Sequence, residues 1–314
     1  MEILTLNLYE DRQDVTLTAY LLPDSREMLR GGSRPAVVVC PGGGYFDCSD
    51  KEGEPVALRF AAMGYHAFVL RYSVYAGVTG HPLNPKKPAE PDPRYAAPVQ
   101  MRELGMALLT IRGRAEEWHV APDRIAICGF SAGGHNCAMY ATHWSKPVIT
   151  EALGVPARDL RPNAMILGYA ATDFLHDDKP GCSESMRRLD HSMQTVICGR
   201  DPATEEDLRA VSPCLLVDGD TPPTFLWATS EDRGVSVRNS LRMADALAAQ
   251  GIPFEMHIFE RGHHGLALAG QASAGDTSDV NPDVAQWVPL AEAWLGKRFA
   301  LPLPEPRPNP LFEA

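Results

Sequence analysis

The sequence predicts an α/β fold with a mostly parallel, doubly wound sheet of about eight strands and helices on both faces. Three observations predict it. Short, solidly apolar runs such as Pro35–Cys40 resemble strands buried on both faces. Amphipathic segments such as Val99–His119 separate these runs, as crossover helices do. The alternation continues to about residue 300, so we expect one domain over residues 1–300 rather than two.

The individual elements follow in chain order. Leu4–Leu8 and Val15–Leu22 alternate apolar and polar residues, which predicts an antiparallel pair at one edge of the sheet. The remaining strands are expected at Pro35–Cys40, Ala67–Tyr72, Asp123–Cys128, Ala164–Tyr169, Thr224–Ala228 and Phe254–Phe259. The helices are expected at Glu54–Met63, Val99–His119, residue 131 to about Thr142, Val237–Gln250 and Val284–Leu295.

Two insertions and a tail interrupt or follow this alternation. Residues 76–98 are rich in proline and predict a surface insertion near the carboxyl edge of the sheet. Residues 170–212 are polar and irregular with short helical patches, and a segment of this length in a compact domain is commonly a lid. The tail, residues 301–314, has proline at every second position from 302 to 310 and should run extended. We expect it to form either a strap on the body of the protein or an arm that reaches a neighbouring subunit. The second alternative would make the protein a homo-oligomer.

Charge and cysteine content restrict the partners and the compartment. The formal net charge of −11 makes nucleic acid or an anionic membrane an unfavourable partner and favours a neutral substrate. Seven scattered cysteines without a CxxC pair indicate reduced thiols in the cytoplasm. The acidic start and the lack of a long apolar run predict neither a signal peptide nor a membrane span.

The motif Gly129-Phe130-Ser131-Ala132-Gly133 matches the nucleophile elbow G-x-S-x-G of α/β hydrolases. An apolar strand precedes it and a helix follows it, which is the context that the chemistry needs. The turn exposes the Ser131 hydroxyl at the amino end of a helix, where developing negative charge is favoured. A glycine-rich helix start with Ser131 as a cap is the alternative. We therefore predict Ser131 as the nucleophile.

Cys40-Pro41-Gly42-Gly43-Gly44-Tyr45 directly follows the third strand, where this fold supplies part of its oxyanion hole. Glycines allow the backbone N–H groups of Gly43 and Gly44 to approach a substrate carbonyl without an intervening Cβ atom. A further N–H comes from the residue after the nucleophile, Ala132. A plain glycine-rich turn is the alternative.

The acid and the base of such a site follow the serine in the chain. After the seventh strand, Ser230–Val235 offers Asp232, with Glu231 as its rival. After the last strand, Glu260–Gly265 offers His264, with His263 as its rival. We predict that Asp232 orients His264 and that His264 removes the Ser131 proton during acyl transfer, without a metal or an organic cofactor.

Several residues outside the proposed triad and oxyanion hole are weaker candidates for a pocket, a catalytic role or a metal site. Aromatic side chains at strand ends are candidates for a substrate pocket, although core packing explains them equally well: Tyr45, Phe46, Tyr72 and Tyr169. His135 is expected to pack on its helix. Cys40 and Cys128 end buried strands and should be inert. A cluster with metal-ligand residue types lacks a closed ligand spacing and predicts solvated surface: Asp173, His176, Asp177 and Asp178.

Several motifs together resemble the bacterial acetylxylan-esterase-like α/β hydrolases. They are PGGGY, Glu52–Ala57, Leu70–Val74, Gly129–His135, Pro222–Asp232 and His257–Leu268. The resemblance covers most of the chain, from about Pro35 to Leu268, and places the family's acid and base at Asp232 and His264. It implies removal of acetyl groups from short-chain esters, often acetylated polysaccharides or oligosaccharides. Two departures are Ser236, where a proline is usual, and the additional His263.

The sequence thus favours a serine esterase that acts on a small or oligosaccharide ester. A prolyl-oligopeptidase-like peptidase shares the elbow, but the chain has no room for a large propeller. A dienelactone hydrolase would need cysteine at Ser131. A catalytically inactive binding module is a hypothesis from another class, and the complete Ser–Asp–His set argues against it.

Overall fold

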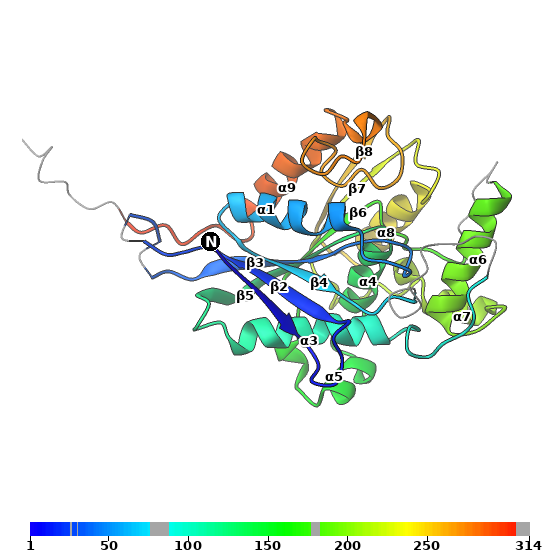
Figure 1. The fold of residues 1–314 in the computed structure, drawn as a ribbon, viewed down its shortest axis with the longest axis horizontal. Coiled ribbons are helices and arrows are strands. Elements are labelled where there is room, and N and C mark those ends of the chain that lie inside the picture. The colour runs from blue at the N-terminus through cyan, green and yellow to red at the C-terminus, as the bar shows by residue number, and fades with distance from the viewer. Residues whose placement is uncertain (26, 30, 76–87, 177–182, 306–314) are drawn as a thin grey trace, which may run out of the picture.

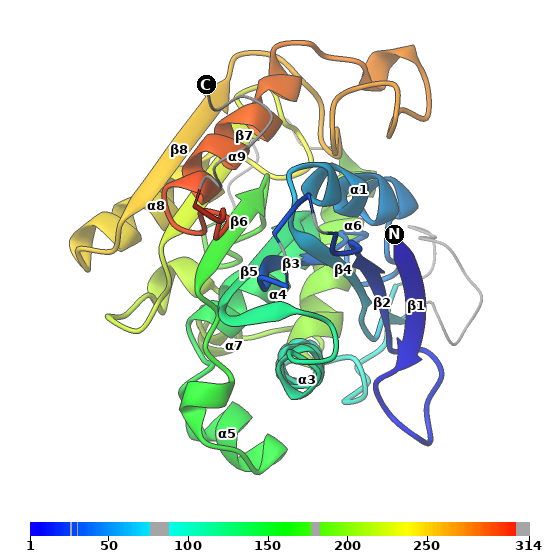
Figure 2. The ribbon, with the colours of Figure 1, turned by 90° about the vertical axis from the view of Figure 1, so that its left-hand side faces the viewer.

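A computed structural model describes residues 1–25, 27–29, 31–75, 88–176 and 183–305. Within these ranges eight strands form one sheet in the order β1-β2-β4-β3-β5-β6-β7-β8, with β1 and β8 at its two edges (Figure 2). The strands are β1 (Glu2–Asn7), β2 (Thr16–Leu21), β3 (Arg34–Cys40), β4 (His66–Arg71), β5 (Val120–Phe130), β6 (Ala164–Gly168), β7 (Thr224–Thr229) and β8 (Phe254–Phe259).

The sheet is parallel from β4 to β8, and the amino-terminal hairpin adds an antiparallel edge. β1 pairs antiparallel with β2, and β2 pairs antiparallel with β4. All further pairs are parallel. The predicted fold class and the predicted edge pair are confirmed.

Helices cover both faces of this sheet (Figure 1). On one face lie α1 (Glu54–Ala62) and α9 (Trp287–Gly296). On the other lie α3 (Val99–Gly113), α4 (Ser131–Ala141) and α8 (Arg238–Ala249), with α5 (Pro147–Leu153) beside α3. Short 3-10 helices complete the described ranges: η1 (Asp50–Glu52), η2 (Ala157–Asp159), η3 (Pro213–Leu215), η4 (Thr277–Asp279) and η5 (Val284–Gln286).

The central strands form because their side chains enter two cores at once. All seven residues of β3 are buried. Val37 and Val39 point into the core under α1 and α9, whereas Ala36 and Val38 point into the core under α3, α4 and α8. Successive strand side chains face opposite sides of a sheet, so an unbroken apolar run is what a doubly covered strand requires.

The long helix after residue 98 is shorter than predicted. We expected it to reach His119, but α3 ends at Gly113 and the chain turns before β5 begins at Val120. His119 has a positive φ of 52°, as part of that turn. The apolar spacing continued past the helix because Trp118 packs on Phe68 of β4, with ring centroids 5.7 Å apart. The spacing there reports core packing and not helical conformation.

The segment 170–212, expected to be irregular, contains two regular helices within its described part. α6 (Glu184–Cys198) starts at Ser183, whose side chain accepts the N–H of Met186. α7 (Glu205–Ala210) starts with a capping box between Thr204 and Asp207. Both helices lie together at one end of the molecule, away from the helices that cover the sheet faces (Figure 1). Both helices are largely polar and bury few side chains, so the sequence indicated them only as short helical patches, and the role of the segment as a lid stays a prediction.

Other predicted segments are partly described. Of the first insertion, residues 76–87 lie outside the described residues, as do residues 306–314 of the tail. The described part of the tail meets the body: a Cβ atom on Gly64 would lie 2.8 Å from Cδ1 of Leu301, and one on Gly32 would lie 3.6 Å from Cγ of Pro302. No helix in the described ranges has the length and apolar character needed to cross a membrane.

Candidate active site

Ser131 lies at the junction of β5 and α4, in a backbone conformation that is rare for a residue with a side chain. Its φ is +49°. The flanking glycines make this turn possible, because a Cβ atom on Gly129 would lie 2.3 Å from the carbonyl oxygen of Gly133. A Cβ atom on Gly133 would lie 2.1 Å from the carbonyl oxygen of Cys40, at the end of β3. The glycines of the motif are therefore steric requirements of the strand–turn–helix junction.

The imidazole of His264 bridges the Ser131 hydroxyl and the Asp232 carboxylate. Its Nε2 lies 2.8 Å from the Ser131 Oγ, and its Nδ1 lies 2.7 Å from the Asp232 Oδ2. A carboxylate only accepts hydrogen bonds, so Nδ1 carries the proton and Nε2 is free to accept the Ser131 proton. The structure thus brings together the three residues that the sequence singled out, in the geometry of a nucleophile, a base and an orienting acid.

Asp232 is fixed by the turn after β7. Its Oδ1 accepts the N–H groups of Gly234 and Val235, at 2.8 and 3.0 Å, and its side chain is only 1% exposed. Gly234 also leaves room for the base, because a Cβ atom there would lie 2.6 Å from Cγ of His264. The rival carboxylate Glu231 points elsewhere and accepts the Gly262 N–H at 3.4 Å.

His263 turns away from the serine. Its Nε2 lies 3.2 Å from the Asp279 Oδ1 and 3.2 Å from the Ser278 carbonyl oxygen. Its Nδ1 donates to the carbonyl oxygen of its neighbour His264 at 2.8 Å. Between the two histidines of the motif, the structure therefore brings His264 and not His263 to Ser131.

The oxyanion loop, residues 41–45, runs directly beside the nucleophile. A Cβ atom on Gly42 would lie 2.8 Å from Cβ of Ser131. Gly43 and Gly44 have positive φ values of 133° and 63°. Within the described part of the chain, the N–H groups of Gly43 and Gly44 have no acceptor in the protein.

Ala132 supplies a further donor on the other side of the nucleophile. It is the second residue of α4, so its N–H has no carbonyl partner within the helix. The three predicted oxyanion donors therefore belong to two backbone segments that both touch Ser131. Such an arrangement can stabilise negative charge on a carbonyl oxygen that Ser131 attacks.

The aromatic residues expected to line a pocket are buried instead, and this expectation is corrected. Tyr45, Tyr72 and Tyr169 are at most 2% exposed, and their hydroxyls bond inside the protein. That of Tyr72 donates to the Pro41 carbonyl at 2.6 Å, and that of Tyr169 donates to the Glu52 carboxylate at 2.6 Å. Phe46 is 7% exposed and packs edge-on against the Tyr75 ring. Tyr72 thereby holds the start of the oxyanion loop, and Tyr169 holds the buried Glu52.

His135 supports the same loop from the helix side. Its side chain is fully buried, and its Nε2–H donates to the Val211 carbonyl at 2.8 Å. Its Nδ1 therefore accepts the Tyr45 hydroxyl, at 2.6 Å. Burial lowers the pKa of His135 to about 4, so the ring is neutral at pH 7. A neutral ring with both nitrogens occupied has no proton-transfer role.

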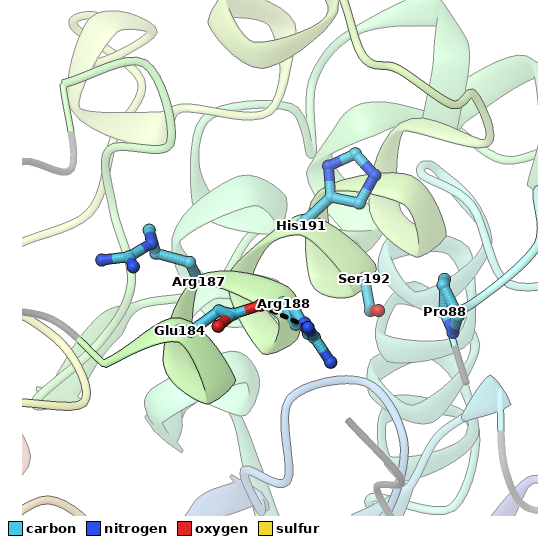
Figure 3. Close-up of a pocket in the computed structure, with 6 residues that line it drawn as sticks. All are labelled: Pro88, Glu184, Arg187, Arg188, His191 and Ser192. Atoms are coloured by element: carbon cyan, nitrogen blue, oxygen red, sulfur yellow. Dashed lines mark hydrogen bonds and ion pairs between the residues drawn. The ribbon is translucent and has the colours of Figure 1, made fainter. Parts of the chain in front are cut away.

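Helix α6 lies next to the oxyanion loop. A Cβ atom on Gly44 would lie 3.2 Å from Sδ of Met193. A cavity of about 210 Å³ opens on the opposite face of this helix, where Glu184 pairs with Arg188 (Figure 3). Glu184 and Met193 are about two and a half turns apart, so they point to opposite sides of α6. The cavity is therefore separate from the surroundings of Ser131. It is lined by Pro88, Glu184, Arg187, Arg188, His191 and Ser192.

The acidic cluster expected on the solvated surface is partly internal. The Asp173 side chain is buried, accepts the N–H groups of Leu175 and His176, and pairs with Arg242 at 2.8 Å. The prediction was wrong for Asp173, because the carboxylate closes a turn and pairs with a cation from α8. Asp177 and Asp178 lie outside the described residues. In the described ranges, no group of three His, Cys, Asp or Glu side chains is arranged to hold a metal ion.

The two cysteines at strand ends behave as expected. Cys40 and Cys128 are fully buried, and burial raises the pKa of both thiols well above its ordinary value. Thiols of this kind are poor nucleophiles. They act as small apolar side chains under the site.

The strand order of the sheet, the nucleophile elbow and the chain order of Ser131, Asp232 and His264 together define an α/β hydrolase. The chain belongs to the BD-FAE family, whose model matches residues 91–247, half of its length. A structure of an acetyl ester-xyloside bifunctional hydrolase from Caldicellulosiruptor lactoaceticus superposes with a TM-score of 0.71 at 28% identity. That match covers 93% of this chain and 95% of the other. The resemblance to acetylxylan-esterase-like hydrolases is thereby confirmed at the level of fold and family.

Two curated relatives match over most of the chain. Endo-1,4-beta-xylanase B of Butyrivibrio fibrisolvens is 33% identical over 75% of this chain and 33% of its own length. An acetylxylan esterase of Xylanibacter ruminicola is 25% identical over 84% of this chain and 46% of its own length. The chain therefore spans between a third and about half of the length of the curated relatives it matches.

Glu52 and Tyr169 are the residues near the site that sequence reasoning did not connect. Glu52 was noticed only as part of a family motif, and Tyr169 only as an aromatic residue at a strand end. The two carry no local signal for their contact, because 117 positions separate them in the chain.

Proposed function

We propose that this protein is a serine carboxylic ester hydrolase that forms an acyl-enzyme on Ser131. One observation carries the proposal: an unbroken hydrogen-bond path from the Ser131 hydroxyl through His264 to Asp232, beside an oxyanion loop whose Gly43 and Gly44 N–H groups bond to no described residue. A capping serine at a helix start would need neither a base nor an orienting acid.

The geometry defines the order of proton transfers. His264 Nε2 takes the Ser131 proton as Oγ attacks the ester carbonyl, and the N–H groups of the oxyanion loop and Ala132 bind the resulting oxyanion. His264 then protonates the leaving alcohol, and the acyl-enzyme forms. In the second half His264 activates water, which releases the acid and regenerates Ser131. Asp232 holds the imidazole in the required tautomer and stabilises its cationic form.

The acyl group that we propose is acetyl, carried on a xylan-type oligosaccharide or a similar short-chain ester. Support comes from the described relatives, one named an acetylxylan esterase and another an acetyl ester-xyloside bifunctional hydrolase. Support also comes from the position of Met193 on α6 beside Gly44, because a side chain at that place restricts the space next to the oxyanion loop.

The proposal is tested by hydrolysis of p-nitrophenyl acetate, butyrate and octanoate and by acetate release from acetylated xylo-oligosaccharides. We expect turnover that falls steeply with acyl length, and Ser131→Ala should lower kcat by at least about 10³-fold. Ser145→Ala is the matched control. Ser145 lies in the loop after α4, and its hydroxyl bonds to Asp220 and not to a histidine. Absence of Ser131-dependent hydrolysis on every ester would contradict the proposal and favour peptide substrates or a binding module.

A further inference from the structure

A buried carboxylate lies behind the oxyanion loop, outside the set of residues that the mechanism uses. Glu52, the last residue of η1, is 3% exposed. Its Oε2 accepts the Gly42 N–H at 2.7 Å, and its Oε1 accepts the Tyr169 hydroxyl at 2.6 Å. No described Lys, Arg or His lies within ion-pair distance of it, and the neighbouring Lys51 pairs with Asp279. A carboxylate kept in such a place is held by its hydrogen bonds alone.

Tyr169 extends this contact to the base. Its hydroxyl donates to Glu52 and accepts the Ala267 N–H at 3.0 Å, and Ala267 follows His264 by three residues. The edge of its ring meets the His264 imidazole, with centroids 5.0 Å apart. Tyr169 itself has a φ of +37°, which is unfavourable for a residue with a side chain and implies that its surroundings fix it.

One end of this network contacts the oxyanion loop, and the other end contacts the loop that carries His264. At one end Gly42 lies against Ser131, since a Cβ atom there would be 2.8 Å from the serine Cβ. At the other end Ala267 and the Tyr169 ring hold the segment that carries His264. One carboxylate therefore connects the oxyanion loop and the histidine loop, which are more than 200 residues apart in the chain.

Burial and hydrogen bonds act in opposite directions on the pKa of the Glu52 carboxyl group. Burial is the largest influence and raises the pKa of Glu52 above its ordinary value, whereas the hydrogen bonds from Tyr169 and Gly42 act in the opposite direction. Both partners donate, so both of their bonds need an acceptor oxygen. A glutamine in place of Glu52 offers one acceptor oxygen and leaves one buried donor without a partner.

We propose that Glu52 and Tyr169 are positioning residues of the ester hydrolase, which together hold the oxyanion loop and His264 in register for acyl transfer. This inference rests on the proposed function. Neither residue touches the reacting atoms, so substrate binding should survive their alteration while the rate of the chemical step falls.

Two pairs of variants test this. Glu52→Gln is matched with Glu103→Gln, because Glu103 is also fully buried and accepts a backbone N–H and a hydroxyl, both from Ser73, although it has Arg12 as a further partner at 3.3 Å. Tyr169→Phe is matched with Tyr140→Phe, whose buried hydroxyl donates to the Leu160 carbonyl at 2.6 Å. Each pair loses the same chemical group from a buried place, and only the first member of each pair belongs to the network of Gly42, Glu52, Tyr169 and Ala267.

The readouts are kcat and KM on p-nitrophenyl acetate, and the affinity for an aryl trifluoromethyl ketone, which forms a hemiketal oxyanion on the serine. Glu52→Gln and Tyr169→Phe should each lower kcat and the ketone affinity by about 10- to 100-fold, with KM within about threefold. The double variant should be little worse than either single one, because both changes break one network. Glu103→Gln and Tyr140→Phe should change kcat by less than about threefold.

The outcomes separate this inference from the proposed function. An active wild type in which the Glu52 and Glu103 variants have the same kcat would overturn the inference alone, as would a rise in KM at constant kcat. A wild type without any Ser131-dependent hydrolysis would overturn the proposed function instead. If Glu52→Gln does not fold, Tyr169→Phe decides the question, since it keeps the carboxylate and removes only the hydroxyl.

Discussion

The oxyanion loop is anchored at both ends, and the two anchors differ in chemistry. At its start, the Gly42 N–H bonds to the Glu52 carboxylate. At its end, the Tyr45 hydroxyl bonds to the neutral imidazole of His135. The first anchor continues through Tyr169 to the loop of His264. The second continues through His135 to Val211, beyond α7, on the side of the molecule where α6 lies.

The difference indicates that the two anchors of the oxyanion loop have different roles, one in the reaction and one in the stability of the fold. The carboxylate anchor connects the loop that binds the oxyanion to the loop that carries His264, so its loss should appear in kcat. The imidazole anchor connects the loop to the segment that follows α7 and has no charged member at neutral pH, so its loss should appear in stability. Measurements of kcat and of the free energy of unfolding on the same variants therefore distinguish the two anchors.

The largest expected effect comes from His264, which the carboxylate anchor positions. His264→Ala should lower kcat/KM on p-nitrophenyl acetate by at least about 10³-fold, because Ser131 loses its general base. His263→Ala is the matched control and should stay within a few-fold of wild type, since its ring faces Asp279 and Ser278. A reversal of these two effects would mean that the histidines exchange roles in the working enzyme.

The second-largest effect is a loss of stability at low pH that comes from the imidazole anchor. The folded pKa of His135 is about 4, below its ordinary 6.5, so the unfolded chain binds a proton that the folded chain refuses. The free energy of unfolding should therefore be highest above pH 6.5 and fall as the pH drops toward 4, by up to about 3 kcal/mol from this residue. His66, whose pKa burial also lowers to about 4, adds a loss in the same direction.

Urea unfolding between pH 7 and pH 4.5 measures this slope. His135→Gln should flatten it by about 1.4 kcal/mol per pH unit, whatever its stability at pH 7. An unchanged slope in the variant would show that His135 is not held neutral, and the distinction between the two anchors would then fail.

The smallest expected effect tests the loop between the anchors. Gly44→Ala and Gly154→Ala place a Cβ atom in nearly the same left-handed conformation, with φ of 63° and 67°. Each should cost about 1 kcal/mol of stability. Only Gly44→Ala should lower kcat, by about tenfold, because the new Cβ meets Met193 and displaces the loop. Equal activity of the two variants would argue that the Gly44 N–H has no part in the reaction.

Local rules explain why much of the site was predictable. The elbow at Ser131 is determined by its own glycines and by the strand and helix that flank it, all within a few residues. Asp232 and His264 follow from the chain order of the fold and from their positions after two recognisable strands. The solidly apolar runs between amphipathic segments likewise predicted the parallel sheet, and the alternation of apolar and polar residues in the first two strands predicted its antiparallel edge.

Contacts between distant segments explain what was missed. The role of Glu52 depends on Tyr169, and that of His135 depends on Tyr45, and no local pattern encodes either meeting. Trp118 extended the apparent helix after residue 98, because core packing on Phe68 imitates helical spacing.

Covalent labelling shows whether Ser131 is an activated nucleophile. The protein is treated with diethyl p-nitrophenyl phosphate, and the adduct is located by mass spectrometry of the intact chain and its peptides. Attack of the Ser131 Oγ on phosphorus forms a serine phosphotriester and releases p-nitrophenolate, with His264 accepting the proton. We predict one diethyl phosphoryl group per chain, on Ser131, with none on the Ser131→Ala variant and far slower labelling of His264→Ala. An adduct on another residue, or none on Ser131, would mean that Ser131 is not the nucleophile.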